Sequence, residues 1–117
     1  MANLGIKLKC LSLNVQGIRN PKTRKALFRT FKQLNVDVIA LQETYLIDSD
    51  VTLIENEWKG SIHLSAGTKR SKGLLTLFND SVSKGKTIIL GKHEHILTSL
   101  VEINDETFIF FKYLQPK

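Results

Sequence analysis

Two short apolar segments on either side of an amphipathic stretch constrain this chain more than any other feature. Residues 6–13 alternate between apolar and basic side chains and then become mainly apolar, which predicts a strand entering a core. Residues 36–41 are mainly apolar, a pattern typical of a strand covered on both faces. The spacing suits a βαβ unit of roughly 30 residues. We therefore expect the chain to begin with two parallel strands joined by a right-handed helical crossover.

The helix between these strands is predicted from its two ends and its apolar spacing. An Asn-Pro pair at residues 20–21 is a favourable helix start, and Asn35 can end the helix in the left-handed conformation. Leu27, Phe31 and Leu34 lie on one helical face, so we expect them to form the buried stripe. The basic residues of this segment would then cover most of the remaining helix surface.

A short helix and a run of strands are expected downstream. The helix covers residues 50–58, with Asp48 or Ser49 as its cap, and the candidate strands cover residues 61–66, 73–79, 86–90, 96–103 and 107–113. The last two strands flank the polar residues 104–106, a pattern typical of a hairpin. No repeat or linker divides the chain, so residues 1–117 are expected to form a single α/β domain.

Composition excludes several classes of protein. No apolar run approaches the roughly 20 residues that a membrane-spanning helix needs, and the first residues do not resemble a signal peptide. Cys10 is the single cysteine, so neither an intrachain disulfide nor a cysteine-built zinc site can form. We therefore expect a reducing, intracellular location, with the nucleus as one option.

The charges of the chain fall into alternating blocks. Residues 1–36 have a net charge of +8, residues 37–57 of −6, residues 58–92 of +6 and residues 93–117 of −2, which sum to the overall +6. A basic balance favours a polyanionic partner such as DNA, although a charge run by itself is more often a solvated surface. The candidate phosphate contacts are basic residues near the predicted helix and before Gly73, namely Lys22, Arg24, Lys25, Lys69, Arg70 and Lys72.

Asn14 and Glu43 stand at the carboxyl ends of the first two predicted strands. Because ligands collect at the carboxyl ends of parallel strands, we expect these side chains to meet. A carboxylate beside an amide oxygen suits Mg²⁺, which binds through a few protein oxygens, water and substrate phosphates. The spacing alone leaves a second interpretation open, in which Asn14 forms a turn and Glu43 caps a loop.

Several motifs together resemble one known family. Residues 11–18 read Leu-Ser-Leu-Asn-Val-Gln-Gly-Ile, and residues 36–44 form an apolar strand that ends in Leu-Gln-Glu-Thr. Trp58-Lys59-Gly60 and the segment 71–78 continue in the same register. This pattern, from about Leu8 to Tyr113, resembles the endonuclease/exonuclease/phosphatase superfamily. Within it, the sequence is most similar to the apurinic-type endonuclease domain of vertebrate non-LTR (LINE-type) retrotransposons.

The resemblance implies a fold and a set of site residues. The fold would be the N-terminal half of a four-layer α/β sandwich, with a βαβ start followed by mainly antiparallel strands. Asn14 would lie near the metal and the phosphate, and Glu43 would be the principal Mg²⁺ ligand. Tyr113 would contact the scissile phosphate, although the ending Tyr-Leu-Gln-Pro is one residue longer than the family's Tyr-x-Pro.

The chain ends before two further motifs of the family, Asp-x-Asn and Ser-Asp-His, which would supply the water-activating side of the site. His63 is expected in a strand, and His93 and His95 in a polar turn, so none of these histidines is expected to replace the missing base. The chain is therefore expected to be an incomplete domain. One apolar sheet face would be exposed unless a C-terminal half or a second copy of the chain covered it.

Three functions remain open from the sequence. The first is the N-terminal part of a Mg²⁺-dependent endonuclease domain that hydrolyses DNA phosphodiester bonds, with this chain inactive alone. The second is a catalytically dead fragment that still binds nucleic acid. The third is a phosphatase of the same superfamily that acts on small phosphoesters, which the basic flanks around Glu43 make a weaker fit.

Overall fold

A computed structural model describes residues 8–67, 72–83, 86–93, 96–103 and 106–113, with only part of the side chains in the last strands. The elements follow in the order β1 (Cys10–Asn14), α1 (Pro21–Leu34), β2 (Val38–Gln42), η1 (Asp48–Asp50), α2 (Val51–Glu57), β3 (Ile62–Ser65), β4 (Leu74–Phe78), α3 (Asp80–Ser83), β5 (Lys86–His93), β6 (Ile96–Ile103) and β7 (Glu106–Tyr113). The periodicity predicted neither η1 nor the four residues of α3.

The strands form two sheets. The first has the order β1-β2-β4-β3, and the second has the order β5-β6-β7. β1 and β2 pair in parallel, with Asn14 opposite Gln42, as the βαβ prediction requires. The other described pairings are antiparallel, including the expected hairpin between β6 and β7. A bulge between Ile89 and Gly91 lets β5 run three residues beyond its predicted end.

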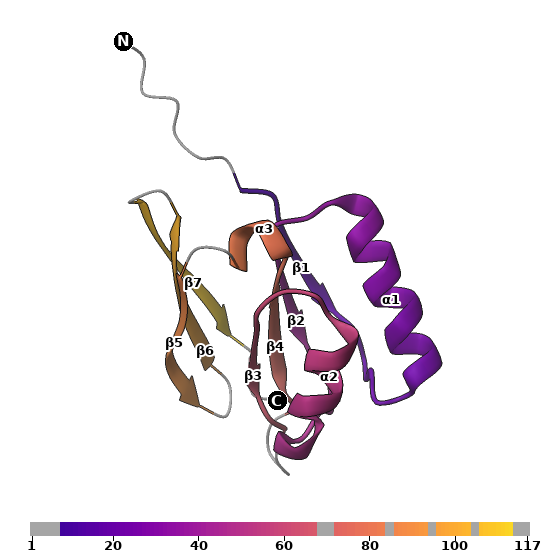
Figure 1. Ribbon diagram of the computed structural model, residues 1–117. Helices are drawn as coiled ribbons and strands as arrows, with labels where there is room; N and C mark the ends of the chain where they lie inside the picture. Colours follow the sequence, from indigo (N-terminus) through magenta and orange to yellow (C-terminus); the bar gives the residue numbers. More distant parts are fainter. Residues whose placement is uncertain (1–7, 68–71, 84–85, 94–95, 104–105, 114–117) are drawn as a thin grey trace.

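The elements form three layers (Figure 1). α1 and α2 cover one face of the four-stranded sheet, and the three-stranded sheet lies on the opposite side. The two sheets make contact through β3 and β6, where His63 Nδ1 lies 2.6 Å from Ser99 Oγ. Within the described ranges, no helix is long and apolar enough to cross a membrane.

The sheet face turned away from α1 and α2 differs from the uniformly apolar face that the sequence led us to expect. Its apolar residues from β2 and β4 are buried against α3 and β7, in a small cluster of Val38, Phe78, Val82 and Phe108. Leu11 packs toward the helices, so its neighbours point to the opposite face. These neighbours on β1 are small or polar and exposed, namely Cys10, Ser12 and Asn14.

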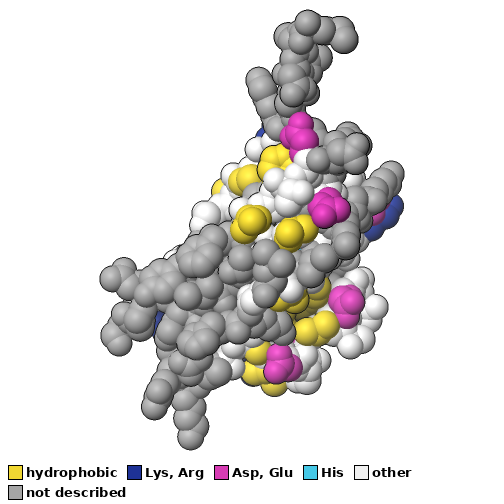
Figure 2. Space-filling view, turned by 90° about the vertical axis from the view of Figure 1, so that its left-hand side faces the viewer, with side chains coloured by type: hydrophobic (Ala, Val, Ile, Leu, Met, Phe, Trp, Pro, Cys, Tyr) yellow, Lys and Arg dark blue, Asp and Glu magenta, His cyan; other side chains and the backbone are white. Residues whose placement is uncertain are grey.

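On the side of β5–β7, the described side chains carry little basic charge. Figure 2 shows the molecule from the side of β5–β7, where hydrophobic and acidic side chains of the described residues are visible. Lys and Arg side chains appear only at the margins of this view. The basic residues of the described part therefore lie mainly on other faces.

α1 has the predicted ends and a different buried stripe. The Asn20 side chain accepts hydrogen bonds from the Lys22 and Thr23 N–H groups, and Asn35 ends the helix with φ 55°. Its buried residues are Arg24, Phe28 and Phe31, which share one face just as the predicted set does. Leu34 is 55% exposed, so the predicted stripe was wrong at that end.

Arg24 can occupy the buried face because every polar side of its guanidinium has a partner. Nη1 donates to the carbonyls of Ile18 and Arg19 at 3.0 and 3.1 Å, and Nη2 donates to Glu57 Oε2 at 2.7 Å. Nε donates to the other Glu57 oxygen, which makes the pair bidentate. The hydrogen bond from Arg24 lowers the pKa of Glu57, against the opposing effect of burial. This pair ties α1 to α2.

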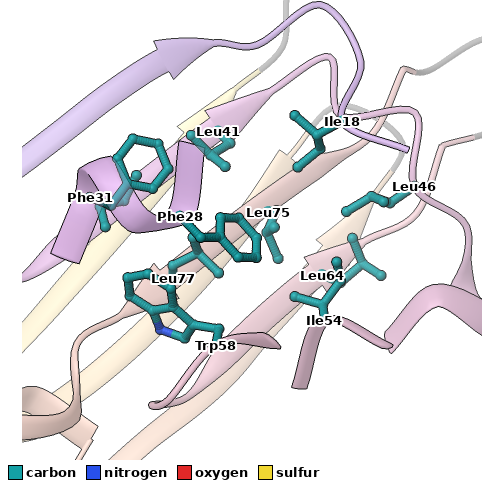
Figure 3. Close-up of a cluster of buried hydrophobic side chains, with 11 residues drawn as sticks. Ile18, Phe28, Phe31, Leu41, Leu46, Ile54, Trp58, Leu64, Leu75 and Leu77 are labelled. Carbon is teal, nitrogen blue, oxygen red and sulfur yellow. The ribbon is translucent and has the colours of Figure 1, made fainter. Parts of the chain in front are cut away.

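The main core lies between these helices and the first sheet (Figure 3). Phe28 packs edge-on against Trp58, with ring centroids 5.5 Å apart. The other buried members come from α1, α2, the loops and the inner faces of the strands, namely Ile18, Phe31, Ile39, Leu41, Leu46, Ile54, Leu64, Leu75 and Leu77. Ile18 and Leu46 belong to the loops that follow β1 and β2. The core therefore also anchors the loops at the carboxyl end of the parallel pair.

Removing the carboxylate of Glu57 should destabilise the fold. Arg24 is 1% exposed, and breaking a buried ion pair on one side costs about 3–5 kcal/mol because the remaining charge is left without a partner. We expect Glu57→Ala to lower the free energy of unfolding by about 3 kcal/mol, measured by urea denaturation with circular dichroism. Glu55→Ala, at an exposed position of the same helix, should change it by no more than about 0.5 kcal/mol. Equal losses from both variants would contradict this role for the pair.

Candidate active site

Three chain segments meet beyond the carboxyl ends of β1 and β2. The parallel ladder continues into both loops, because Val15, Gly17 and Ile18 donate their N–H groups to the carbonyls of residues 42, 43 and 44, at 3.0, 2.6 and 3.0 Å. The loop before β4 joins from the other side, where residues 44 and 45 donate to the carbonyls of Gly73 and Lys72 at 3.3 and 2.7 Å. The residues around Glu43 are thus held by backbone hydrogen bonds on both sides.

The backbone of this region adopts an uncommon conformation. Gln16, Glu43 and Tyr45 have φ angles of 48°, 58° and 60°, in the left-handed region that non-glycine residues seldom adopt. Each such residue costs of order 1–3 kcal/mol, and such residues cluster at functional sites. Here the hydrogen bonds from the neighbouring loops offset that cost. The conformation turns the chain sharply after β2 at the residue that bears the carboxylate.

Two glycines permit the close approach of the three segments. A Cβ on Gly17 would lie 2.9 Å from a ring carbon of Tyr45, and one on Gly73 would lie 2.8 Å from Thr44 Oγ1. Both residues also have positive φ angles, of 95° and 89°. Thr44 itself is fully buried, and its hydroxyl accepts a hydrogen bond from the Leu46 N–H group. These positions therefore favour glycine for space as well as for backbone conformation.

Asn14 and Glu43 meet as predicted. The Asn14 side-chain amide donates a short hydrogen bond from Nδ2 to Glu43 Oε2. Its own Oδ1 accepts from the Gln16 N–H group at 3.1 Å, which fixes which end of the amide faces the carboxylate. Asn14 is exposed, whereas the Glu43 side chain is only 14% exposed. Asn14 therefore positions the carboxylate of Glu43 by a donated hydrogen bond.

Lys72 reaches the other oxygen of the same carboxylate. Its Nζ lies 3.3 Å from Glu43 Oε1 and 6.0 Å from the centroid of the Tyr45 ring. Hydrogen bonds and charge interactions with Glu43 and then Tyr45 raise the pKa of Lys72. The ammonium group is therefore held in its charged form beside the carboxylate. The site combines one negative group with one positive group, both open to solvent on one side.

Sequence reasoning placed Lys72 among phosphate contacts and missed its pairing with Glu43. It also missed Gln16, Thr44 and Tyr45, which support the site through the backbone. The available signals were Gly17 and Gly73, since a glycine after a strand or before one often marks a tight approach. The left-handed residues carry no such mark, because Gln and Tyr are not typical of that conformation.

The remaining predicted site residues have mixed outcomes. Lys22 and Lys25 are exposed on α1, whereas Arg24 is buried on Glu57, which does not fit a role in phosphate contact. Lys69 and Arg70 lie outside the described residues, as does the side chain of Tyr113 at the end of β7.

Of the three histidines, His63 is the one whose side chain the structure describes, and it lies away from this site. His63 is buried on Ser99 and packs against Phe78. His93 is the last residue of β5 rather than part of the turn that the sequence led us to expect. The side chain of His93 and the whole of His95 lie outside the described residues.

Residues 11–114 match the sequence pattern of the endonuclease/exonuclease/phosphatase family. The chain belongs to this family. Its segment from the first strand to the end of β7 is the part that matches, so both Asn14 and Glu43 lie inside it. None of the curated proteins compared with the chain matches it significantly.

Solved structures of this fold are similar to the chain. The endonuclease domain of TRAS1, a telomere-specific non-LTR retrotransposon, superposes with a TM-score of 0.64 at 13% identity, covering 91% of this chain and 45% of that one. The AP endonuclease LMAP from Leishmania major superposes with a TM-score of 0.64 at 17% identity, covering 89% of this chain and 38% of that one. The Xenopus laevis APE2 catalytic domain superposes with a TM-score of 0.61 at 20% identity, covering 92% of this chain and 45% of that one. The chain spans less than half the length of each, which fits a half domain.

The donor set fits a divalent cation through one carboxylate. Mg²⁺ in proteins is commonly bound by one or two carboxylates, with water and substrate phosphates completing its shell. Glu43 can serve in this way, and the Asn14 oxygen already accepts one hydrogen bond, from the Gln16 N–H group. Within the described ranges, no group of three or more His, Cys, Asp or Glu side chains could hold a metal alone. Further oxygens would have to come from water, from substrate or from another segment.

Replacing Lys72 should strengthen divalent-cation binding at Glu43. The ammonium competes with any cation for Glu43 Oε1, and two unit charges about 4 Å apart interact by roughly 1 kcal/mol in water. We expect Lys72→Met to lower the Kd for Mg²⁺ by about three- to tenfold, measured by isothermal titration calorimetry. Lys59→Met removes an exposed charge that pairs with Asp80, and should leave this Kd unchanged. A weaker or unchanged Kd in Lys72→Met would show that the ammonium does not compete with the metal.

Proposed function

We propose that this chain is the N-terminal part of a Mg²⁺-dependent endonuclease domain that hydrolyses DNA phosphodiester bonds. The observation that carries the proposal is the Glu43 carboxylate, held between the Asn14 amide and the Lys72 ammonium where the loops after β1 and β2 meet. Family membership supports phosphoester chemistry in general. The arrangement of one carboxylate and one cation supports metal-assisted attack at a phosphate.

Each residue has a proposed part in that chemistry. Glu43 would hold the metal, which would polarise a phosphoryl oxygen and offset the charge on the leaving oxygen. Asn14 keeps the carboxylate oriented, since its N–H group donates to one of the two oxygens. With a cation bound to Glu43, the Lys72 ammonium would be free to neutralise a phosphate oxygen instead. Tyr113 remains a proposed contact to the scissile phosphate.

The water-activating side of the site is proposed to come from outside these 117 residues. The family's Asp-x-Asn and Ser-Asp-His motifs do not occur in this sequence, and the similar structures are more than twice as long as the part they share with it. A C-terminal half or a second copy of the chain would supply that side. We infer that the chain alone is inactive.

DNA is the proposed substrate because of the exposed basic residues near the site. Lys22 and Lys25 lie on α1 directly after the loop that follows Asn14, and Lys72 lies at the carboxylate. The motif resemblance to retrotransposon endonucleases supports the same substrate. An intracellular location, including the nucleus, would suit a protein that acts on DNA. The same basic residues also favour the second candidate, a fragment that binds nucleic acid without catalysis. Divalent-metal binding at Glu43 separates the two.

Neutralising Glu43 should weaken metal binding. We expect Glu43→Gln to raise the Kd for Mg²⁺ at least tenfold, because the amide keeps the shape of the side chain and removes its charge. Isothermal titration calorimetry measures the Kd, and Glu55→Gln provides an exposed control with the same change in net charge. Equal effects of the two substitutions, or no Mg²⁺ binding by the unmodified chain, would favour the nucleic-acid-binding fragment.

The isolated chain should cleave DNA negligibly, even with Mg²⁺. A positioned general base contributes about 10²–10⁴-fold to a rate, and stabilisation of phosphoryl charge is often larger still. A nicking assay on supercoiled plasmid checks this, with Glu43→Gln and a chelator as controls. Mg²⁺-dependent nicking that Glu43→Gln abolishes would contradict the expectation of inactivity. It would mean that a base from elsewhere, such as a second copy of the chain, completes the site.

A further inference from the structure

A row of basic side chains runs along one face of α1. Its members are spaced three, four and three residues apart, which places them on a single helical face, and all are exposed: Lys22, Lys25, Arg29 and Lys32. Successive members are roughly 4.5–6 Å apart along the helix axis, and the row is about 15 Å long. α1 contains no acidic residue. We refer to these four residues as the α1 basic row.

The α1 basic row borders a groove between α1 and α2. This hollow of about 430 Å³ is lined by Lys25, Phe28, Arg29, Lys32, Asn56 and Glu57. Three of the six lining residues thus belong to the row. The single acid among them, Glu57, is already paired with the buried Arg24. The groove therefore keeps most of the positive charge of the row.

The charges of the row are available to a ligand. Within the described ranges, Lys25 and Arg29 form no ion pair, and Lys32 lies 5.9 Å from the centroid of the Trp58 ring. The aromatic residues beneath the groove are buried, with Phe28 2% and Trp58 4% exposed. They offer no surface on which a base could stack. A ligand of this groove would be held mainly by its negative charges.

We propose that the α1 basic row is a track for the phosphate backbone of a nucleic acid. The proposal rests on the proposed function and extends it, since it says where the substrate strand runs beyond the cleaved phosphate. Lys22 lies in the first turn of α1, close in sequence to the loop that follows Asn14. Lys32 lies in the last turn, so the track leads away from the candidate active site.

A nucleic acid fits this row better than an acidic peptide does. The charges of a nucleic acid form a regular linear series, as do those of the row. The row begins at the end of α1 that is close in sequence to a site proposed to take a phosphodiester. The absence of exposed aromatic residues in the groove predicts binding without sequence preference, because phosphate contacts carry no information about the bases. Such binding weakens steeply with salt, since each contact releases a counterion.

A matched pair of double variants tests the track. Lys25→Gln with Arg29→Gln removes two charges from the row, and Lys9→Gln with Lys59→Gln removes two from exposed positions elsewhere. Fluorescence anisotropy with a short labelled duplex, repeated over a range of salt concentrations, measures the affinity of each. We expect the first double variant to reduce the slope of log K against log salt by about 1.8, or about 0.9 per contact. The second should retain the slope of the unmodified chain.

Three results would overturn the proposal. One is an equal loss of slope in both double variants, which would indicate that net charge alone matters. Another is a labelled poly-glutamate that binds as tightly as the duplex with the same sensitivity to the row. The third is no duplex binding by the unmodified chain at low salt. Circular dichroism confirms that each variant is folded. The first double variant should also keep its Kd for Mg²⁺, so failure of the track and failure of the Glu43 site are separate results.

Discussion

The parallel pairing of β1 and β2 is the constraint on which the rest of the structure depends. It places Asn14 opposite Gln42 and therefore beside Glu43, and it continues as backbone hydrogen bonds into the two loops beyond the strands. A parallel pair requires a crossover, and α1 supplies it while burying its apolar face on the same sheet. The site, the crossover helix and the core are consequences of this one pairing.

The backbone around Glu43 adopts φ angles that are unfavourable in free energy, and hydrogen bonds from adjacent loops offset this cost. Three neighbouring positions adopt left-handed φ angles, and hydrogen bonds from adjacent loops hold them there. The carboxylate that results has a donor on each oxygen, the Asn14 amide on one and the Lys72 ammonium on the other. This arrangement keeps the carboxylate oriented before any cation arrives, which is the preorganisation that catalytic sites need.

Sequence patterns predicted the structure correctly where the stabilising interactions join residues close together in the chain. The Asn20 cap, the left-handed Asn35 and the strand positions follow from interactions within a few residues, and the structure confirms them. Leu34 was placed wrongly because more than one apolar face satisfies helical spacing. Which face becomes buried depends on partners elsewhere in the chain. α3 was missed because its four residues are too few to show a helical period. Asn79 accepts a hydrogen bond from the Val82 N–H group at its start and donates one to the Val36 carbonyl.

The sequence by itself determined the βαβ start, the meeting of Asn14 with Glu43 and the family to which the chain belongs. Periodicity and motif spacing carry this information, since neighbouring parallel strands bring their carboxyl ends together. Only the tertiary structure decided that Arg24 is a buried partner of Glu57, 33 residues away, and that Lys72 pairs with Glu43 across 29 residues. A charged side chain looks the same in the sequence whether it faces water or a carboxylate. Its role is settled only when folding selects its neighbour.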